Sequence, residues 1–137
     1  MNNEKMEVGL FQENIKSTYC SKIAKTDEEK KALFNALEKC DILLNDIVGQ
    51  ELEIKDIFCE EREIVDEKTG ELKKKYRTIL FDVDGKSYVT GSYGIYNVLK
   101  KIFAVYGLPT AWSNPIKVKV DKKKINDGKT SLTLTIL

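Results

Sequence analysis

The sequence predicts a mainly β protein with helices, of the α+β class, in which five strands form one small barrel and a helix lies between the third and fourth strands. The 137 residues suffice for one modest core. From residue 51 onward, alternating strand patterns dominate and a single helical pattern interrupts them. Two prolines, eight glycines and 42% apolar residues fit an ordinary globular chain.

The N-terminal quarter divides into an arm and a helix. Residues 1–25 show weak periodicity, which favours a poorly ordered arm or an added edge element, and we expect one domain over residues 26–137. Thr26 and Glu29 have the spacing of a capping box. Apolar residues then recur at helical spacing as far as Leu44, and Gly49 ends the connection that follows. We therefore predict a helix over residues 27–44.

The first barrel strand begins at Glu51, where the period changes to two. Leu52 and Ile54 alternate with charged residues, and after Asp56 the apolar positions resume one residue out of phase. Such a slip is typical of a β-bulge, which bends a strand so that it serves both sides of a small barrel. We predict a bent strand over residues 51–65.

Turn signals separate the next strands. A charged loop over residues 66–70 ends in glycine and precedes a second strand over about residues 74–83. Asp84 and Gly85 predict a type I′ hairpin turn, because that turn needs positive φ at both central residues. Residues 86–91 form the third strand.

A helix and two strands complete the pattern. Ser92 is a suitable N-cap, apolar residues at helical spacing run to Tyr106, and Gly107 with Pro109 ends the helix. Strands over residues 116–121 and 132–136 flank a basic loop over residues 122–128. The order β-β-β-α-β-β is that of the five-stranded OB-like Greek-key barrel, named for oligonucleotide and oligosaccharide binding. An α+β sandwich is the main alternative.

Charge is distributed unevenly along the chain, although its net value is +1. Residues 70–130 hold thirteen basic and five acidic residues, a balance of +8, and the remaining residues carry −7. A concentrated basic segment is typical of a protein that binds a polyanion. Two solvated surfaces of opposite sign are the structural alternative.

Candidate binding residues lie on the elements that OB barrels use for binding, the second and third strands and the adjoining loops. Single-stranded nucleic acid needs a positive groove and rings on which bases stack. We favour an outward face that carries Lys75, Arg77, Ile79 and Phe81 on the second strand, continued by Lys86, Tyr88 and Thr90 on the third. In the reverse register Tyr76 replaces Phe81. The predicted nucleic-acid-binding residues are Phe58, Lys73, Lys74, Lys75, Tyr76, Arg77, Phe81, Lys86, Tyr88, Lys117, Lys119, Lys122 and Lys124.

These residues also have structural interpretations. Aromatic residues in strands more often pack in a core, and lysine runs in hairpin loops are often solvated tips. The coincidence of both residue types on the binding elements favours the functional interpretation.

Catalysis is not expected. The chain has no histidine and three widely spaced cysteines, so we predict no zinc site, disulfide framework or histidine-based mechanism. The acidic run from Glu60 to Glu67 lacks EF-hand spacing, and residues 91–94 lack a P-loop lysine. We predict a binding protein without catalytic residues, metal or cofactor. The N-terminus has no apolar signal core, so we expect a cytoplasmic protein without a membrane partner.

Several segments resemble a known family. The runs DIVGQELEIKDIFCEEREIVDEKTGE, YRTILFDVDGKSYVTGSYGIYNVLKKIFAVYGLPTAW, PIKVKV and GKTSLTLTIL resemble single-stranded DNA-binding proteins of bacteriophages of low-GC Gram-positive hosts. The resemblance covers roughly residues 27–137. It implies an OB-like fold and sequence-independent coating and protection of single-stranded DNA during phage replication. It implies no catalysis. As partners we expect single-stranded DNA and replication proteins, in the host cytoplasm.

A second function remains open at this point. The same barrel could be a protein-interaction module, for example a phage inhibitor that binds an acidic host protein. The sequence is compatible with a monomer or a small homo-oligomer.

Overall fold

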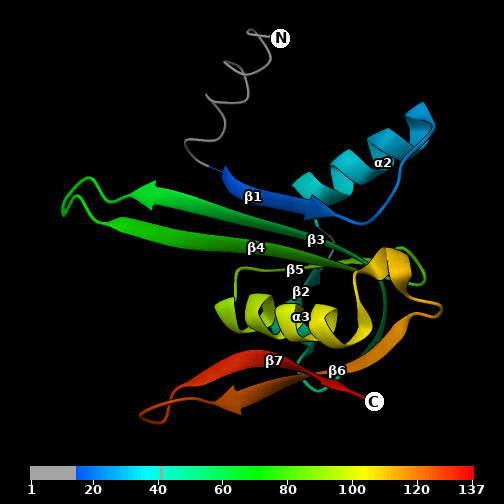
Figure 1. Ribbon diagram of the computed structural model, residues 1–137. Helices are drawn as coiled ribbons and strands as arrows, with labels where there is room; N and C mark the ends of the chain where they lie inside the picture. The colour runs from blue at the N-terminus through cyan, green and yellow to red at the C-terminus, as the bar shows by residue number, and fades with distance from the viewer. Residues whose placement is uncertain (1–14, 41) are drawn as a thin grey trace, which may run out of the picture.

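One curled, mixed sheet with a long helix on each face makes up the α+β architecture of the computed structural model, which describes residues 15–40 and 42–137 (Figure 1). The strands are β1 (Ile15–Cys20), β2 (Ile42–Leu43), β3 (Glu51–Val65), β4 (Leu72–Asp82), β5 (Ser87–Thr90), β6 (Ile116–Lys124) and β7 (Thr130–Ile136). The helices are α2 (Asp27–Glu38) and α3 (Tyr93–Tyr106), with short 3-10 turns η1 (Leu44–Ile47) and η2 (Pro109–Ala111). The sheet order is β2-β5-β4-β3-β6-β7, and β1 pairs with β3.

The predicted bend in the first barrel strand is confirmed. The register of β3 against β4 shifts between Ile54 and Asp56. Before the shift β3 pairs with β6, and after it β3 pairs with β1. The Ser21 hydroxyl donates to Asp56 Oδ1 at 2.9 Å and accepts from the Ile57 N–H at 2.9 Å. Because these bonds satisfy polar groups beside the irregularity, the bulge is a stable part of the sheet.

The five-stranded OB barrel is not confirmed. Four pairings expected of such a barrel are present, namely β3 with β4, β4 with β5, β3 with β6, and β6 with β7. Within the described residues, however, no pairing joins β5 to β7. The strand β2 pairs in parallel with β5 and occupies the edge that a closing strand needs. The sheet is therefore an open half-barrel.

Apolar side chains are buried on both faces of the sheet. The main core lies between the sheet and α3, and includes Ile57, Leu80, Leu99 and Val120. A second cluster of Phe58, Ile79 and Phe81 lies on the opposite face, where Leu33, Ala36 and Leu37 of α2 pack against it. Successive residues of a strand point to opposite faces, so Leu80 and its neighbours Ile79 and Phe81 enter different clusters.

The helix starts are predicted correctly, whereas the end of α2 is not. Thr26 caps α2: its hydroxyl oxygen accepts from the Glu29 N–H at 3.1 Å. The helix ends at Glu38 instead of residue 44. Leu44 belongs to η1 and is fully buried in the core. The apolar residues beyond residue 38 therefore enter the core from other elements and do not continue the helix. The predicted cap Ser92 and end Gly107 of α3 are confirmed.

The turn between β4 and β5 differs from the prediction. Of the two residues predicted at its centre, only Gly85 has a positive φ, 84°, so the type I′ assignment is wrong. The Asp82 carboxylate instead accepts from the N–H groups of Asp84 and Lys86, each at 2.9 Å. These side-chain bonds support a backbone turn in which the Gly85 N–H donates to the Asp82 carbonyl at 3.1 Å.

Residues 15–20 of the predicted arm form the edge strand β1, and residues 1–14 lie outside the described part of the chain. Among the described residues, no helix has the length and apolar content needed to cross a membrane.

Candidate nucleic-acid interface

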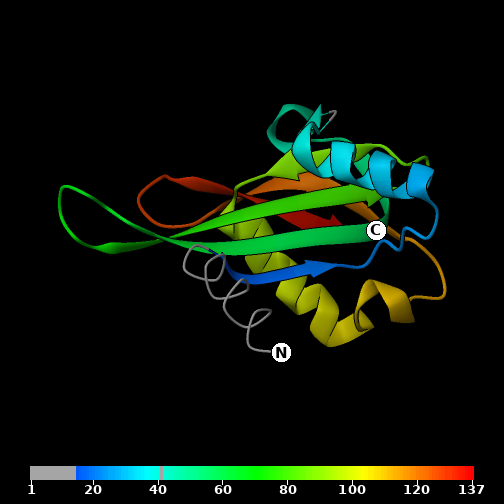
Figure 2. The same cartoon turned by 90° about the horizontal axis from the view of Figure 1, so that it is seen from above.

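Two hairpins project from the same end of the molecule, one formed by β3 and β4 and the other by β6 and β7, and α3 begins between them (Figures 1 and 2). Gly94 permits this placement of α3. A Cβ atom on Gly94 would lie 2.1 Å from Ser131 Oγ and 2.4 Å from the Leu132 carbonyl oxygen. The first turn of α3 therefore lies directly against β7.

Three tyrosine rings meet at the start of α3. Tyr76 of β4 has its ring centroid 5.2 Å from that of Tyr93 and 4.5 Å from that of Tyr96, with interplanar angles of 54° and 42°. Tyr93 is 52% exposed, and the other two rings are half-buried. We call Tyr76, Tyr93 and Tyr96 the tyrosine cluster.

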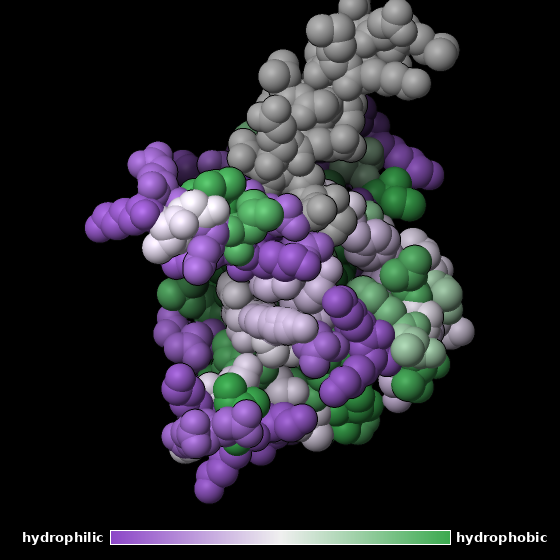
Figure 3. Space-filling view, turned by 60° about the vertical axis from the view of Figure 1, so that its left-hand side comes forward, coloured by the Kyte–Doolittle hydropathy of each residue, from purple (hydrophilic) through white to green (hydrophobic). Residues whose placement is uncertain are grey.

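Basic side chains from both hairpins share the face of the sheet that carries the cluster. Tyr76 and Lys74 alternate in phase with the core residue Leu80, and Lys122 and Lys124 alternate in phase with the core residue Val120. These positions continue the concave face of the sheet beyond the core. Figure 3 shows this end of the molecule, with hydrophilic side chains at its borders and paler ones between them.

The lysines near the tyrosine cluster differ in whether a ring or a carboxylate contacts their ammonium group. Lys100 Nζ lies 4.8 Å from the centroid of the Tyr96 ring. Lys74 Nζ lies 3.7 Å from Glu61 Oε1, which offsets part of its charge. Within the described residues, Lys122 and Lys124 form no ion pair and are exposed. The β6–β7 hairpin thus offers exposed charges that no acidic side chain of the described residues offsets.

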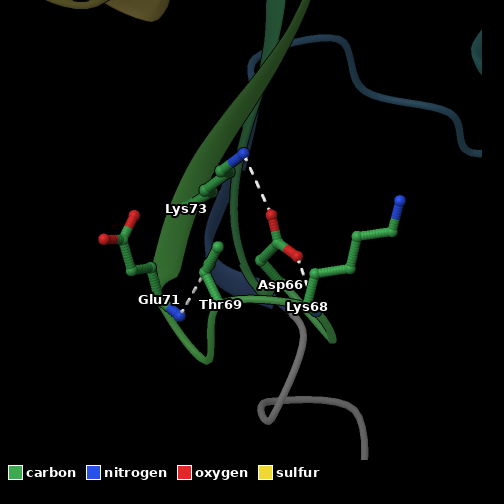
Figure 4. Close-up of polar contacts among 5 residues, drawn as sticks. All are labelled: Asp66, Lys68, Thr69, Glu71 and Lys73. Atoms are coloured by element: carbon green, nitrogen blue, oxygen red, sulfur yellow. Dashed lines mark hydrogen bonds and ion pairs between the residues drawn. The ribbon is translucent and has the colours of Figure 1, made fainter.

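The tip of the β3–β4 hairpin is ordered by its own polar contacts (Figure 4). Asp66 Oδ1 accepts from the Lys68 N–H at 2.8 Å, and Asp66 Oδ2 lies 3.2 Å from Lys73 Nζ. These two interactions, the backbone bond first, lower the pKa of the Asp66 carboxyl. Lys73 therefore holds the hairpin tip together as well as contributing charge.

The predicted outward face of the second and third strands is wrong. Phe81 is 1% exposed and Phe58 is 7% exposed, both in the cluster beneath α2. Tyr88 is 6% exposed in the main core, and its hydroxyl donates to Asp82 Oδ2 at 2.8 Å. Thr90 is also buried. The prediction did not foresee that α2 covers one face of these strands while the main core covers the other.

Lys75 and Arg77 lie on the α2 face, opposite the tyrosine cluster. They line a groove of about 420 Å³ together with Arg62, Glu60 and other residues, and Tyr76 of the cluster also borders it. Arg62 is bonded to Glu60, and Arg77 Nη2 lies 3.9 Å from Cys40 Sγ. We call this the arginine groove.

Three further predicted lysines lie away from the hairpin tips. Lys86 follows the far end of β4, and Lys117 lies 3.3 Å from Glu51 at the start of β6. Lys119 pairs with Glu51 in the sheet register. The structure therefore separates Lys86, Lys117 and Lys119 from the tyrosine cluster.

Sequence reasoning missed Tyr93, Tyr96 and Lys100. All three lie off the apolar stripe of α3, at spacings of three and four residues, so they share a second face of that helix. Two tyrosines on the polar face of a helix were the available signal.

Rings and available cations on one open face, next to an ordered hairpin, are the parts that a single-stranded nucleic-acid-binding protein requires. The arrangement is typical of that class of protein. A family model described as "Phage Single-stranded DNA-binding protein" matches residues 12–137.

The chain therefore belongs to the phage single-stranded DNA-binding protein family of the phi29 type. It binds single-stranded DNA during phage replication and is not an enzyme. No curated protein and no solved structure matches the chain.

Proposed function

We propose that a single strand of DNA crosses the concave face between the two hairpins, with its bases stacked on the tyrosine cluster and its phosphates near the lysines of the hairpins. The observation that carries this proposal is the meeting of Tyr76, Tyr93 and Tyr96 within 4.5–5.2 Å on an open face. Each base stacked on an aromatic ring stabilises binding by about 1–3 kcal/mol.

This site favours binding that is independent of sequence, which coats and protects the strand. Every base has a π-face, so ring stacking accepts all four, and lysines attract the phosphates that all sequences share. Lys122 and Lys124 are exposed and suited to that role.

The arginine groove is the competing surface. Both of its arginines already have a contact, because Arg62 is bonded to Glu60 and the half-buried Arg77 contacts Cys40, whereas Lys75 is exposed. It also lacks the three-ring arrangement of the tyrosine cluster. We therefore favour the concave face.

Three further inferences, on the domain, the sheet and the place of action, accompany this proposal. We infer one domain over residues 26–137, with the preceding residues as an arm that adds β1 to the sheet. We also infer that the half-barrel is an OB-like sheet in which β2 takes the edge of β5. The host cytoplasm, where phage DNA is replicated, is the proposed place of action.

Replacement of Tyr93 tests the site. Tyr93→Ala should weaken binding of fluorescently labelled oligo(dT) about tenfold, because it removes one stacking ring. Tyr106→Ala is the matched control, since Tyr106 is also on α3 and is 47% exposed, but lies at the other end of the helix. Equal affinities of the two variants and the original protein would contradict the proposed site.

A further inference from the structure

We propose that the cavity between β1, β3 and α3 takes one unstacked nucleobase of the bound strand. This inference rests on the proposed function, because the cavity adjoins the tyrosine cluster. It adds a base pocket to a surface that otherwise only stacks bases.

The cavity lies next to the tyrosine cluster, further along α3. Its volume is about 300 Å³, which lies at the lower end of the range for small-molecule sites and suits a single planar ring system. Tyr96 belongs both to the tyrosine cluster and to the cavity wall. A strand that stacks on Tyr76 and Tyr93 would thus pass the mouth of this cavity.

The wall is aromatic and apolar. Phe103 and Leu99 line it from α3, and Tyr19 lines it from β1, with the Tyr19 and Phe103 rings edge to face at 6.1 Å. Burial raises the pKa of the Cys59 thiol, which also lines the cavity, to about 11. The thiol is therefore neutral at pH 7 and does not repel a nucleic acid. Apolar rings favour a flat base over a phosphate.

One cation supplies polarity. Lys100 lines the cavity and lies over the Tyr96 ring, where its ammonium could turn to the phosphate of the inserted nucleotide. The buried Tyr19 hydroxyl has no hydrogen-bond partner among the described residues. This oxygen has less than 1 Å² of accessible surface, so it does not face the open part of the cavity.

The test compares two ligands of equal length, oligo(dT) and an oligomer of abasic deoxyribose phosphates. Cys59→Met extends a flexible apolar side chain from the cavity wall, and Cys20→Met, the same substitution at an exposed cysteine of β1, is its control. We expect Cys59→Met to weaken oligo(dT) binding about tenfold and to leave abasic binding unchanged. Cys20→Met should match the original protein with both ligands.

A second variant keeps the test decisive if Cys59→Met does not fold. Phe103→Leu removes a wall ring while keeping an apolar side chain, and it should produce the same selective loss. If a folded variant binds oligo(dT) as tightly as the original protein, the cavity takes no base. Equal weakening of both ligands would likewise overturn the base pocket. Failure of the original protein to bind oligo(dT) at low salt would instead contradict the proposed function.

Discussion

Gly94 determines how closely α3 approaches β7, and hence where Tyr93 and Tyr96 lie. The space for a side chain is already filled by Ser131 Oγ and the Leu132 carbonyl oxygen. Tyr93 directly precedes this glycine and Tyr96 follows it by two residues, so a shift of the helix start would move both rings relative to Tyr76.

We predict that Gly94→Ala destabilises the protein by about 1–3 kcal/mol, as inserted methyl groups do in packed interiors. The higher helix propensity of alanine offsets up to about 1 kcal/mol of that loss. Thermal unfolding followed by circular dichroism measures the effect. Asn97→Ala, at an exposed position of the same helix, is the control and should leave the melting temperature nearly unchanged. An unchanged melting temperature for Gly94→Ala would contradict the close contact.

The sequence could not decide to which face of the sheet the side chains of β4 point. The alternation of β4 places Tyr76 and Phe81 on opposite faces, and both faces contain apolar residues because α2 and α3 each cover one. Nothing local to β4 distinguishes the face that opens to solvent. Tyr76, the ring of the reverse register, and Arg77, on the face we favoured, are both half-buried, so burial at these two positions does not separate the registers.

Secondary-structure elements were predicted more successfully than their packing. The bulge of β3 and the caps of α2 and α3 follow from local chemistry, and the structure agrees with them. The parallel pairing of β2 with β5 depends on contacts between residues more than forty positions apart, such as Ile42 with Tyr88. Such tertiary pairing overrides the apolar spacing that had extended α2 to residue 44.

The β3–β4 hairpin depends on Asp66 for the order of its tip. The folded-state pKa of this carboxyl is lowered by its bonds to the Lys68 N–H and Lys73, relative to about 3.9 in an unfolded chain. Its stabilising effect is therefore fully present above the unfolded pKa and is lost as pH falls through the folded value.

We predict that Asp66→Asn speeds amide hydrogen exchange at Gly70, whose N–H donates to the Asp66 carbonyl at 2.7 Å. The variant should also lose the increase in exchange that protonation of Asp66 causes as pH falls. Glu67→Gln changes the same charge at the neighbouring exposed position and should leave the exchange rate unchanged. Exchange measured by NMR across pH 3–6 distinguishes the two variants. Identical behaviour of both would argue against the tip contacts.

Charge is segregated across the molecule as well as along the sequence. Exposed Lys122, Lys123 and Lys124 lie on the β6–β7 hairpin. At the other end of β3 and β4, a groove of about 210 Å³ is lined by Glu51, Glu53, Asp82 and Asp84 with Lys117. We therefore expect a DNA strand to be attracted to the first end and repelled from the second.

The salt dependence of binding should reflect this polarity. Lys122→Gln with Lys124→Gln should reduce the slope of log affinity against log salt by about 1.4, since each neutralised phosphate contributes about 0.7 on single strands. Lys86→Gln with Lys117→Gln removes the same charge at the far end and should leave the slope unchanged. Equal slopes for the two double variants, measured by oligo(dT) titration, would contradict the assignment of the hairpin end.

The most direct test of the binding face is the pattern of NMR shifts when oligo(dT) is added. We predict that ring resonances of Tyr76, Tyr93 and Tyr96 shift strongly, while those of Phe58 and Phe81 beneath α2 stay in place. Shifts concentrated at Arg62, Lys75 and Arg77, with the tyrosine rings unaffected, would place the DNA in the arginine groove and contradict the account.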